Sequence, residues 1–316
     1  MLANVRLFVF LAIVPLAAGC AGPDLTKQNF PRTTVTASAQ AGGPINDAAV
    51  TLPALRTIDP CGLIDSATLA DLGAAERPAT SDPDACTNVV RDAGGKRLQI
   101  NLRLGGIVID PRKASGTVEG LPLIVEKAGD SHCDVTAVIS RSPGLGIAAG
   151  IDYSGGDACG AGRTVLQKVL RKIHAGPPRL ATPAGSALAV DLCAVPDASV
   201  TTEVLGRGSE SSAAGLHRCE WSGGAANGYL SLQQTGIPGE DDGVPVNLGG
   251  VTGYRKLEVR AGKRCTISWL QRATQDGEGE VISVEYDNYH DDAAKDDACG
   301  KALKIVRSAL PKLPKA

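Results

Sequence analysis

Asp157-Ala158-Cys159-Gly160 recurs near the end of the chain as Asp297-Ala298-Cys299-Gly300. Each copy precedes a segment with apolar residues at helical spacing, so each is expected to open a long helix. Further cysteines match in the same way. Cys61, Cys86, Cys133 and Cys159 are followed by Cys193, Cys219, Cys265 and Cys299, at offsets of 132, 133, 132 and 140 residues. Two matched sets of four cysteines predict a tandem repeat of one disulfide-bonded domain.

The beginnings of the two repeats also match. Ile58-Asp59-Pro60-Cys61 corresponds to Val190-Asp191-Leu192-Cys193. An aspartate follows four residues later in each copy and opens a short apolar-patterned segment that ends at a glycine. Asp at the start and Gly at the stop predict two short helices, one from Asp65 to Gly73 and one from Asp197 to Gly206.

The segments between the short and long helices have a period of two, which is typical of half-buried strands. The clearest example alternates Leu98, Ile100, Leu102 and Leu104 with polar residues. Several strands without an intervening helix favour an antiparallel sheet. The predicted fold class is α+β: two tandem two-layer sandwiches, each an antiparallel sheet with a short N-terminal and a longer C-terminal helix, and two disulfides per domain.

Four cysteines in a domain allow three pairings, and spacing alone does not select one. The first and fourth cysteines of each repeat are expected at helix starts, and the second and third in strands. If the two helix cysteines of a repeat bond each other and the two strand cysteines bond each other, the pairing is nested, and this is the pairing we expect. Its four bonds are Cys61–Cys159, Cys86–Cys133, Cys193–Cys299 and Cys219–Cys265.

Residues 1–19 have the features of a secretory signal, with Arg6 before an apolar run that is too short to span a bilayer. The run ends in Leu16-Ala17-Ala18-Gly19-Cys20, which resembles the lipobox of bacterial lipoproteins. That resemblance implies that Cys20 is acylated, with palmitate for example, and holds the mature chain on the extracytoplasmic face of the cell membrane. An ordinary cleaved signal that leaves Cys20 as a free thiol is the alternative.

The remaining boundaries follow from composition. Residues 20–55, rich in Thr, Ala, Gly and Pro, are expected to form a flexible tether. Residues 56–175 form the first predicted repeat, 176–186 a Pro- and Gly-containing linker, and 187–316 the second repeat. Lys and Arg (32) nearly balance Asp and Glu (34), which argues against nucleic acid as a partner and against electrostatic attachment to anionic lipid.

The motifs Asp59-Pro60-Cys61 and Cys219-Glu220-Trp221, with a terminal helix that begins at a cysteine, resemble a family of exported actinobacterial lipoproteins that carry a domain of unknown function. The resemblance covers both repeats. The sequence differs from the family pattern at two positions. Cys86 is not followed by a Trp two residues later, and Leu192 stands where the family has Pro. The family also resembles extracellular sensor domains of actinobacterial Ser/Thr kinases. The resemblance implies an envelope location and supports the fold, but it transfers no catalytic residue.

Three residue patterns contain residue types that occur in catalytic, metal or phosphate sites. His132-Cys133-Asp134 contains catalytic residue types, but neighbours in a strand point to opposite faces, and Cys133 is expected in a disulfide. No metal-ligand spacing is present, and the acidic stretches are expected to be solvated loops or helix-start acids rather than a calcium site. The glycine clusters at 144–150 and 160–162 lack the context of a phosphate loop. The acidic residues concerned are Glu240, Asp241, Asp242, Asp287, Asp291, Asp292, Asp296 and Asp297.

Two long loops, residues 107–120 and 235–247, are candidate binding segments because loops over a rigid sheet often carry function. The large aromatic residues of the second repeat are expected mainly in its core, with a ligand groove as the less favoured alternative. They are Trp221, Tyr229, Tyr254 and Trp269.

The sequence therefore predicts a lipid-anchored envelope protein that is not an enzyme and needs no cofactor or metal. Its role would be a binding or sensing module for a partner protein or a small ligand. The alternative is a carrier of an envelope lipid or glycolipid, which would require a large apolar cavity. A hydrolase is a third, weaker hypothesis, because no cleft with converging titratable groups can be assembled from the sequence.

Overall fold

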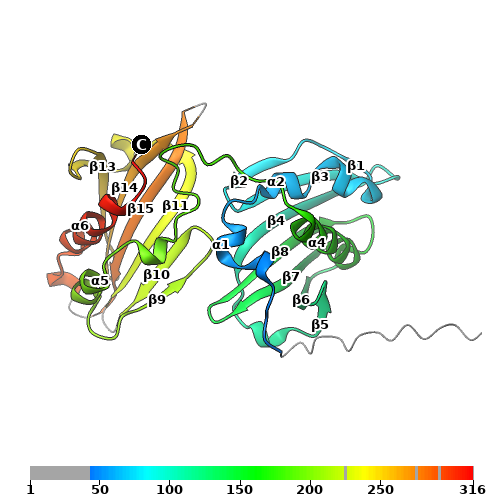
Figure 1. Cartoon of the computed structure of the whole chain (residues 1–316), viewed down its shortest axis with the longest axis horizontal. Coiled ribbons are helices and arrows are strands. Elements are labelled where there is room, and N and C mark those ends of the chain that lie inside the picture. Colours follow the sequence, from blue (N-terminus) through cyan, green and yellow to red (C-terminus); the bar gives the residue numbers. More distant parts are fainter. Residues whose placement is uncertain (1–42, 224–225, 275–276, 291–292, 316) are drawn as a thin grey trace, which may run out of the picture. The chain divides into compact units, whose positions relative to one another are not determined.

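The computed structural model describes residues 43–223, 226–274, 277–290 and 293–315. They form an α+β structure with two antiparallel sheets and few helices, as predicted (Figure 1). Cys20 and the predicted signal lie outside the described residues. In the part of the chain that the structure describes, no helix is long and apolar enough to cross a membrane.

The first sheet has eight strands in the order β1-β3-β4-β8-β7-β6-β5, and β2 also pairs with β3. Leu98, Ile100, Leu102 and Leu104 of β4 are all buried, so the predicted alternation is confirmed. The strands are β1 (Ala74–Ala75), β2 (Ala79–Asp82), β3 (Ala85–Arg91), β4 (Arg97–Ile107), β5 (Gly116–Val118), β6 (Leu121–Ala128), β7 (His132–Arg141) and β8 (Gly144–Tyr153).

The second sheet has seven strands in the order β12-β13-β14-β15-β11-β10-β9. With β12 matched to β5 and β13 to β6, this is the strand order of the first sheet, which is consistent with a tandem repeat. The strands are β9 (Glu210–Ala213), β10 (Arg218–Ser222), β11 (Asn227–Gly236), β12 (Val244–Asn247), β13 (Thr252–Val259), β14 (Lys263–Ala273) and β15 (Glu278–Asn288).

A long helix packs on one face of each sheet, where it contributes to a separate hydrophobic core. Helix α4 (Ala158–Ala175) lies against β7 and β8, and α6 (Ala298–Ala309) against β14 and β15. Both begin at the predicted cysteine motifs. Short helices precede each sheet: α1 (Leu52–Leu55), α2 (Pro60–Leu63) and α3 (Ser66–Leu69) in the first repeat, and α5 (Ala198–Leu205) in the second.

The segment just before the first predicted domain is part of its core. Residues Ala48–Val50 form a 3-10 turn, α1 follows, and the side chains of Val50 and Leu55 are buried in the first core. Residues 48–55 therefore belong to the first domain, and the predicted tether of residues 20–55 extends too far toward the carboxyl end. Its residues 20–42 lie outside the described part of the chain.

The predicted linker, residues 176–186, is hydrogen-bonded along its length. Asp59 N–H donates to the carbonyl of Pro178, and Leu180 N–H donates to that of Thr57. Near the other end, the Gln271 side chain donates to the carbonyl of Gly185. The linker is thus tied to regular structure at both ends and is not a free connector.

The four disulfides join cysteines that are neighbours in sequence, so the nested pairing expected from the sequence is wrong. The bonds are Cys61–Cys86, Cys133–Cys159, Cys193–Cys219 and Cys265–Cys299, with Cα–Cα distances of 5.0 to 5.2 Å. Cys61–Cys159, Cys86–Cys133, Cys193–Cys299 and Cys219–Cys265 are not bonded.

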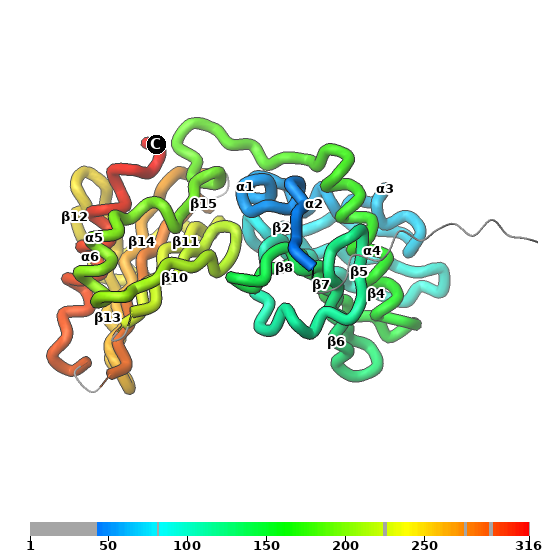
Figure 2. Tube along the Cα trace, turned by 60° about the horizontal axis from the view of Figure 1, so that its bottom comes forward, coloured from blue at the N-terminus to red at the C-terminus, as the bar shows by residue number. Residues whose placement is uncertain are grey.

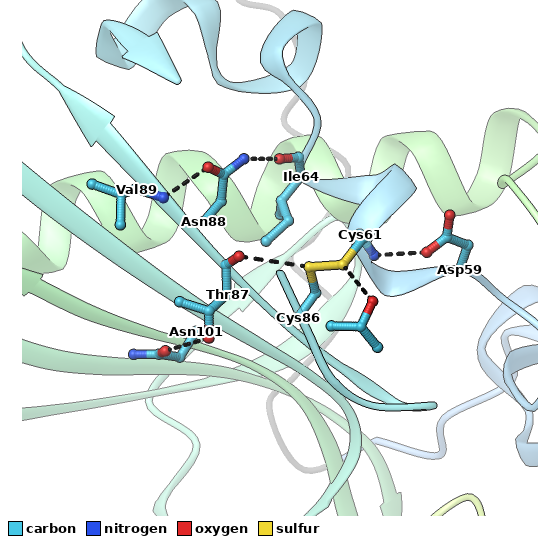
Figure 3. Close-up of a disulfide and its surroundings, with 9 residues drawn as sticks. Asp59, Cys61, Ile64, Cys86, Thr87, Asn88, Val89 and Asn101 are labelled. Atoms are coloured by element: carbon cyan, nitrogen blue, oxygen red, sulfur yellow. Dashed lines mark hydrogen bonds between the residues drawn. A yellow bond between two sulfur atoms is a disulfide. The ribbon is translucent and has the colours of Figure 1, made fainter. Parts of the chain in front are cut away.

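Sheet order explains the correction. Cys86 on β3 and Cys133 on β7 are separated by β4 and β8, and three strand spacings amount to about 14 Å. A disulfide spans Cα atoms only about 7 Å apart at most. Each strand cysteine instead bonds a cysteine of the helical layer that packs on its sheet. Cys86 and Cys133 bond cysteines of α2 and α4, and Cys219 and Cys265 bond cysteines of the 3-10 turn Leu192–Ala194 and of α6. Figure 3 shows this for Cys61 and Cys86, where Asp59 also caps the turn by accepting from Cys61 N–H.

Candidate functional site

The second repeat contains a cavity of about 580 Å³ at one end of its sheet. Three parts of the chain form it: the turn between β12 and β13, the inward face of β14, and the segment from the last turn of α6 onward. These parts meet at the same end of the second sheet in both views (Figures 1 and 2). The lining residues are Leu248, Gly249, Gly250, Val251, Trp269, Leu270, Gln271, Arg307, Leu310, Pro311, Leu313, Pro314 and Lys315.

The turn that forms one wall is fixed by its own sequence. Gly249 and Gly250 both have positive φ angles, 99° and 104°, a conformation that glycine adopts without strain. The side-chain oxygen of Asn247 accepts hydrogen bonds from both glycine N–H groups, at 2.8 and 3.2 Å. Leu248 is buried in the core beside this turn, so it anchors the wall to the domain.

The floor of the cavity comes from β14, where Trp269 and Gln271 point toward the core. The Gln271 amide donates to the carbonyl of Pro314, and this bond holds the segment after α6 against the strand. Trp269 is fully buried, and its indole N–H has no hydrogen-bond partner among the residues that the structure describes. The indole nitrogen has almost no accessible surface, so it does not face the open space of the cavity.

The charges around the cavity are all positive. Arg307 and Lys315 are exposed at its edge, and none of the lining residues is acidic. The remaining lining is mainly Leu, Val, Pro and Gly. The site is therefore an apolar space with hydrogen-bond donors and cations at its edge, which is the general make-up of a small-ligand pocket.

The matching end of the first repeat is closed differently. The side chains of Gln167 and Arg171 both donate to Glu119, in the turn between β5 and β6. Residues 43–48 also cover this end, where Asp47 pairs with His174 at 2.8 Å. What remains is a hollow of about 370 Å³ with two acidic lining residues. The two repeats share a fold but differ at the point where the second has its cavity.

The structure places the histidine of His132-Cys133-Asp134 between two carboxylates. Its ring nitrogens lie 2.8 Å from Asp152 and 3.2 Å from Asp134, and these hydrogen bonds, that to Asp152 first, raise the pKa of His132 above its usual value. Cys133 points to the other face and is bonded to Cys159. The group has no nucleophile.

The acidic stretch is only partly as predicted: Asp297 has the expected helix-start role, whereas Asp287 lies in β15, where it is buried and accepts from the Asn227 side chain. Asp297 caps α6 by accepting from Gly300 N–H, and Asp296 accepts from Tyr286 and pairs with Lys301. Asp291 and Asp292 lie outside the described residues. Within the described ranges, no group of three or more His, Cys, Asp or Glu side chains is placed to hold a metal ion.

The candidate loops form short elements. Residues Pro111–Lys113 form a 3-10 turn whose Arg112 pairs with Asp110, and Ile109 beside it is 98% exposed. In the second repeat, Glu240–Asp242 form a similar turn before β12. The loop 235–247 does not line the cavity itself, but it leads into the turn that does.

Among the four aromatic residues considered, Trp269 alone lines the cavity, and it also belongs to the core. Trp221 is a core residue, whereas Tyr229 and Tyr254 are half-buried. Burial raises the pKa of Tyr229 to about 12, with a further contribution from Glu220. Sequence reasoning did not identify Gln271, Arg307 or the segment after α6 as site residues. The repeated prolines at Pro311 and Pro314 were the available signal that this segment leaves the helix.

Comparison with known proteins assigns no family. No protein-family model and no curated protein matches the chain. Among solved structures, the di-domain ARO/CYC StfQ from the steffimycin biosynthetic pathway aligns over 81% of this chain and 97% of its own, with 13% identity and a TM-score of 0.16. The di-domain ARO/CYC BexL from the BE-7585A biosynthetic pathway aligns over 81% and 92%, with 10% identity and a TM-score of 0.12. Similarity at this level supports no conclusion about the chain.

Proposed function

We propose that this chain is a non-enzymatic envelope protein, anchored through an acylated Cys20, whose second repeat binds a small and largely apolar ligand. Two tandem two-layer domains with two disulfides each would form its rigid frame. Of the two functions expected from the sequence, the cavity favours the carrier of an envelope lipid or glycolipid, because a carrier must shield apolar surface from water.

The cavity of about 580 Å³ is the observation that carries this proposal. Ligand pockets in proteins usually measure about 300–1,000 Å³ and have mostly apolar linings with a few placed polar groups. Its walls come from a glycine turn fixed by Asn247, from a central strand, and from a segment tied down by Gln271. A pre-formed site of this kind binds without a large cost of ordering.

A blocking substitution tests the proposal. Leu310→Trp adds bulk to a half-buried lining residue, whereas Leu257→Trp adds the same bulk to an exposed position on β13 outside the cavity. The measurement is the affinity of the full disulfide-bonded protein for a fluorescent single-chain lipid analogue. We expect Leu310→Trp to weaken binding about tenfold and Leu257→Trp to leave it unchanged. A wild-type protein that does not bind the analogue, or two variants with equal affinity, would contradict the proposal.

A further inference from the structure

We infer that the ligand of the second repeat carries an anionic group, a carboxylate or a phosphate, at the end of its hydrocarbon part. The inference rests on the proposed function and specifies the class of ligand for the same cavity. It starts from the polar side chains of the lining, where Arg307 and Lys315 are cations and can only donate. Only the amide of Gln271 brings an acceptor side chain.

The basic residues of the carboxyl-terminal segment fall into two groups. Three of them have acidic partners: Lys301 pairs with Asp296, Lys304 with Glu203, and Lys312 with Asp197. The other two, Arg307 and Lys315, have no acidic partner among the residues that the structure describes, and both line the cavity. Other exposed cations, such as Arg207 and Lys295, also have no acidic partner among the described residues. What distinguishes Arg307 and Lys315 is that both line the cavity.

In the first repeat, Gln167 occupies the position that corresponds to Arg307 of the second repeat. Gln167 stands eight residues after Cys159, as Arg307 stands eight residues after Cys299. Gln167 donates to Glu119 in the β5–β6 turn, so this side chain is used within the protein. In the second repeat the matching turn has Gly249-Gly250 and no acid. Arg307 therefore has no acidic partner among the described residues, and an anionic group of the ligand can be that partner.

Arg307 suits either a carboxylate or a phosphate, because its planar guanidinium forms paired hydrogen bonds with both. An acidic head at the edge of the cavity would lie beside Arg307 and Lys315, with the hydrocarbon tail within the cavity.

Isothermal titration calorimetry of the full disulfide-bonded protein tests the inference with three ligands of one chain length: hexadecanoate, hexadecyl phosphate and hexadecanol. We expect one or both acids to bind about tenfold more tightly than the alcohol, and the stronger acid identifies the head group. Equal affinity for acids and alcohol would overturn the inference and leave the proposed function intact. Failure of all three to bind would overturn the proposed function itself.

Three variants then locate the contact. Arg307→Gln, which copies the first repeat, should weaken binding of the preferred acid about tenfold and change that of hexadecanol less than about twofold. Arg307→Lys keeps the charge and should stay within about threefold of wild type. Arg207→Gln removes an exposed cation that does not line the cavity and should have no effect. An equal loss with Arg207→Gln would show a general charge effect and would contradict the assignment.

Discussion

Each repeat has an aspartate at the start of its short helix that binds a lysine at or just after the end of the long helix. Asp65 accepts from Thr68 N–H at 2.8 Å, which caps the short helix, and from Lys172 at 2.8 Å. Asp197 accepts from Lys312 at 2.7 Å and from Ser308 at 2.9 Å, but its side chain makes no capping bond to α5. The carboxylate therefore fixes the short helix to the far end of the long segment that packs beside it.

Replacement of Asp65 by Asn should reduce the acid sensitivity of the protein. Burial acts to raise the pKa of Asp65, but hydrogen bonds from Lys172 and Thr68 outweigh it and lower the pKa to about 2. A lowered pKa stabilises the folded state above the unfolded value near 3.8, and this contribution is lost as the pH falls toward 2. Because the Asp65 side chain is 43% exposed, we expect a loss of less than about 1 kcal/mol at pH 7.

Urea unfolding of wild type and Asp65→Asn between pH 7 and pH 2 measures this effect. The difference in unfolding free energy should be largest above pH 5 and should vanish toward pH 2. Asp71→Asn is the control, since its carboxylate pairs with Lys168 but is 73% exposed. A difference between wild type and Asp65→Asn that does not change with pH would contradict this account.

Gly300 and Gly160 provide a matched pair at the starts of the two long helices. A Cβ atom at Gly300 would lie 2.0 Å from an Asp297 carboxylate oxygen, and one at Gly160 would lie 2.5 Å from that of Asp157. Only Asp297 caps its helix with its side chain, so only there does moving the carboxylate break a bond. We expect Gly300→Ala to lower thermal stability by about 1 kcal/mol and Gly160→Ala to be neutral or slightly stabilising. Equal losses in thermal unfolding would show that the cap is not the cause.

Among the elements, the disulfides join the helical layer to the sheet and do not join helix to helix. Cys86 and Cys219 lie on the matched strands β3 and β10, and Cys133 and Cys265 on β7 and β14. Each bonds a cysteine at a helical turn 25 to 34 residues away. In every repeat the two bonds therefore hold two separate points of the helical layer on one face of the sheet.

Peptide mapping without reduction should recover these sequential pairs. We expect linked peptides for Cys61–Cys86, Cys133–Cys159, Cys193–Cys219 and Cys265–Cys299. Replacing both members of one pair by Ala should lower the unfolding free energy by about 2–4 kcal/mol, since each bond closes a loop of moderate length. Recovery of a Cys86–Cys133 peptide from folded protein would contradict the strand order described above.

The secondary structure was largely predictable because it depends on local patterns. Alternating leucines predicted β4, and an aspartate followed by a glycine stop predicted α3 and α5. The disulfide partners were not predictable, because pairing depends on which strands are neighbours. The cavity was not predictable either: its lining joins Leu248, Trp269 and Leu310, and only tertiary packing brings these distant residues together.

In the whole molecule, two copies of one topology have different roles in our proposal. The first repeat narrows its end with Glu119 and with residues 43–48, which leave a smaller hollow with two acidic lining residues, whereas the second keeps an apolar cavity there. A duplicated domain can in this way keep one copy as a rigid spacer while the other binds. In this arrangement the anchor would precede the spacer, and the binding repeat would lie farther from the membrane along the chain.

The anchor itself is tested by Cys20→Ser. If Cys20 is acylated, the intact mass of the membrane-extracted wild type should exceed that of the processed polypeptide by the added lipid. The Cys20→Ser form should move from the membrane fraction to the soluble fraction. A Cys20→Ser protein that still sediments with membranes would argue against acylation as the means of attachment. Its cavity should bind the same ligands, because Cys20 is not a lining residue.

The hydrogen bond between Gln271 and Pro314 has a practical consequence for handling the protein. Because this bond holds Pro314, and Lys315 lines the cavity beside it, residues fused after Ala316 would start next to the ligand site. A purification tag there would compete with the ligand or mask Lys315, and an amino-terminal tag would be removed with the signal. The exposed turn Glu240–Asp242 offers an insertion point that leaves both ends of the chain unaltered.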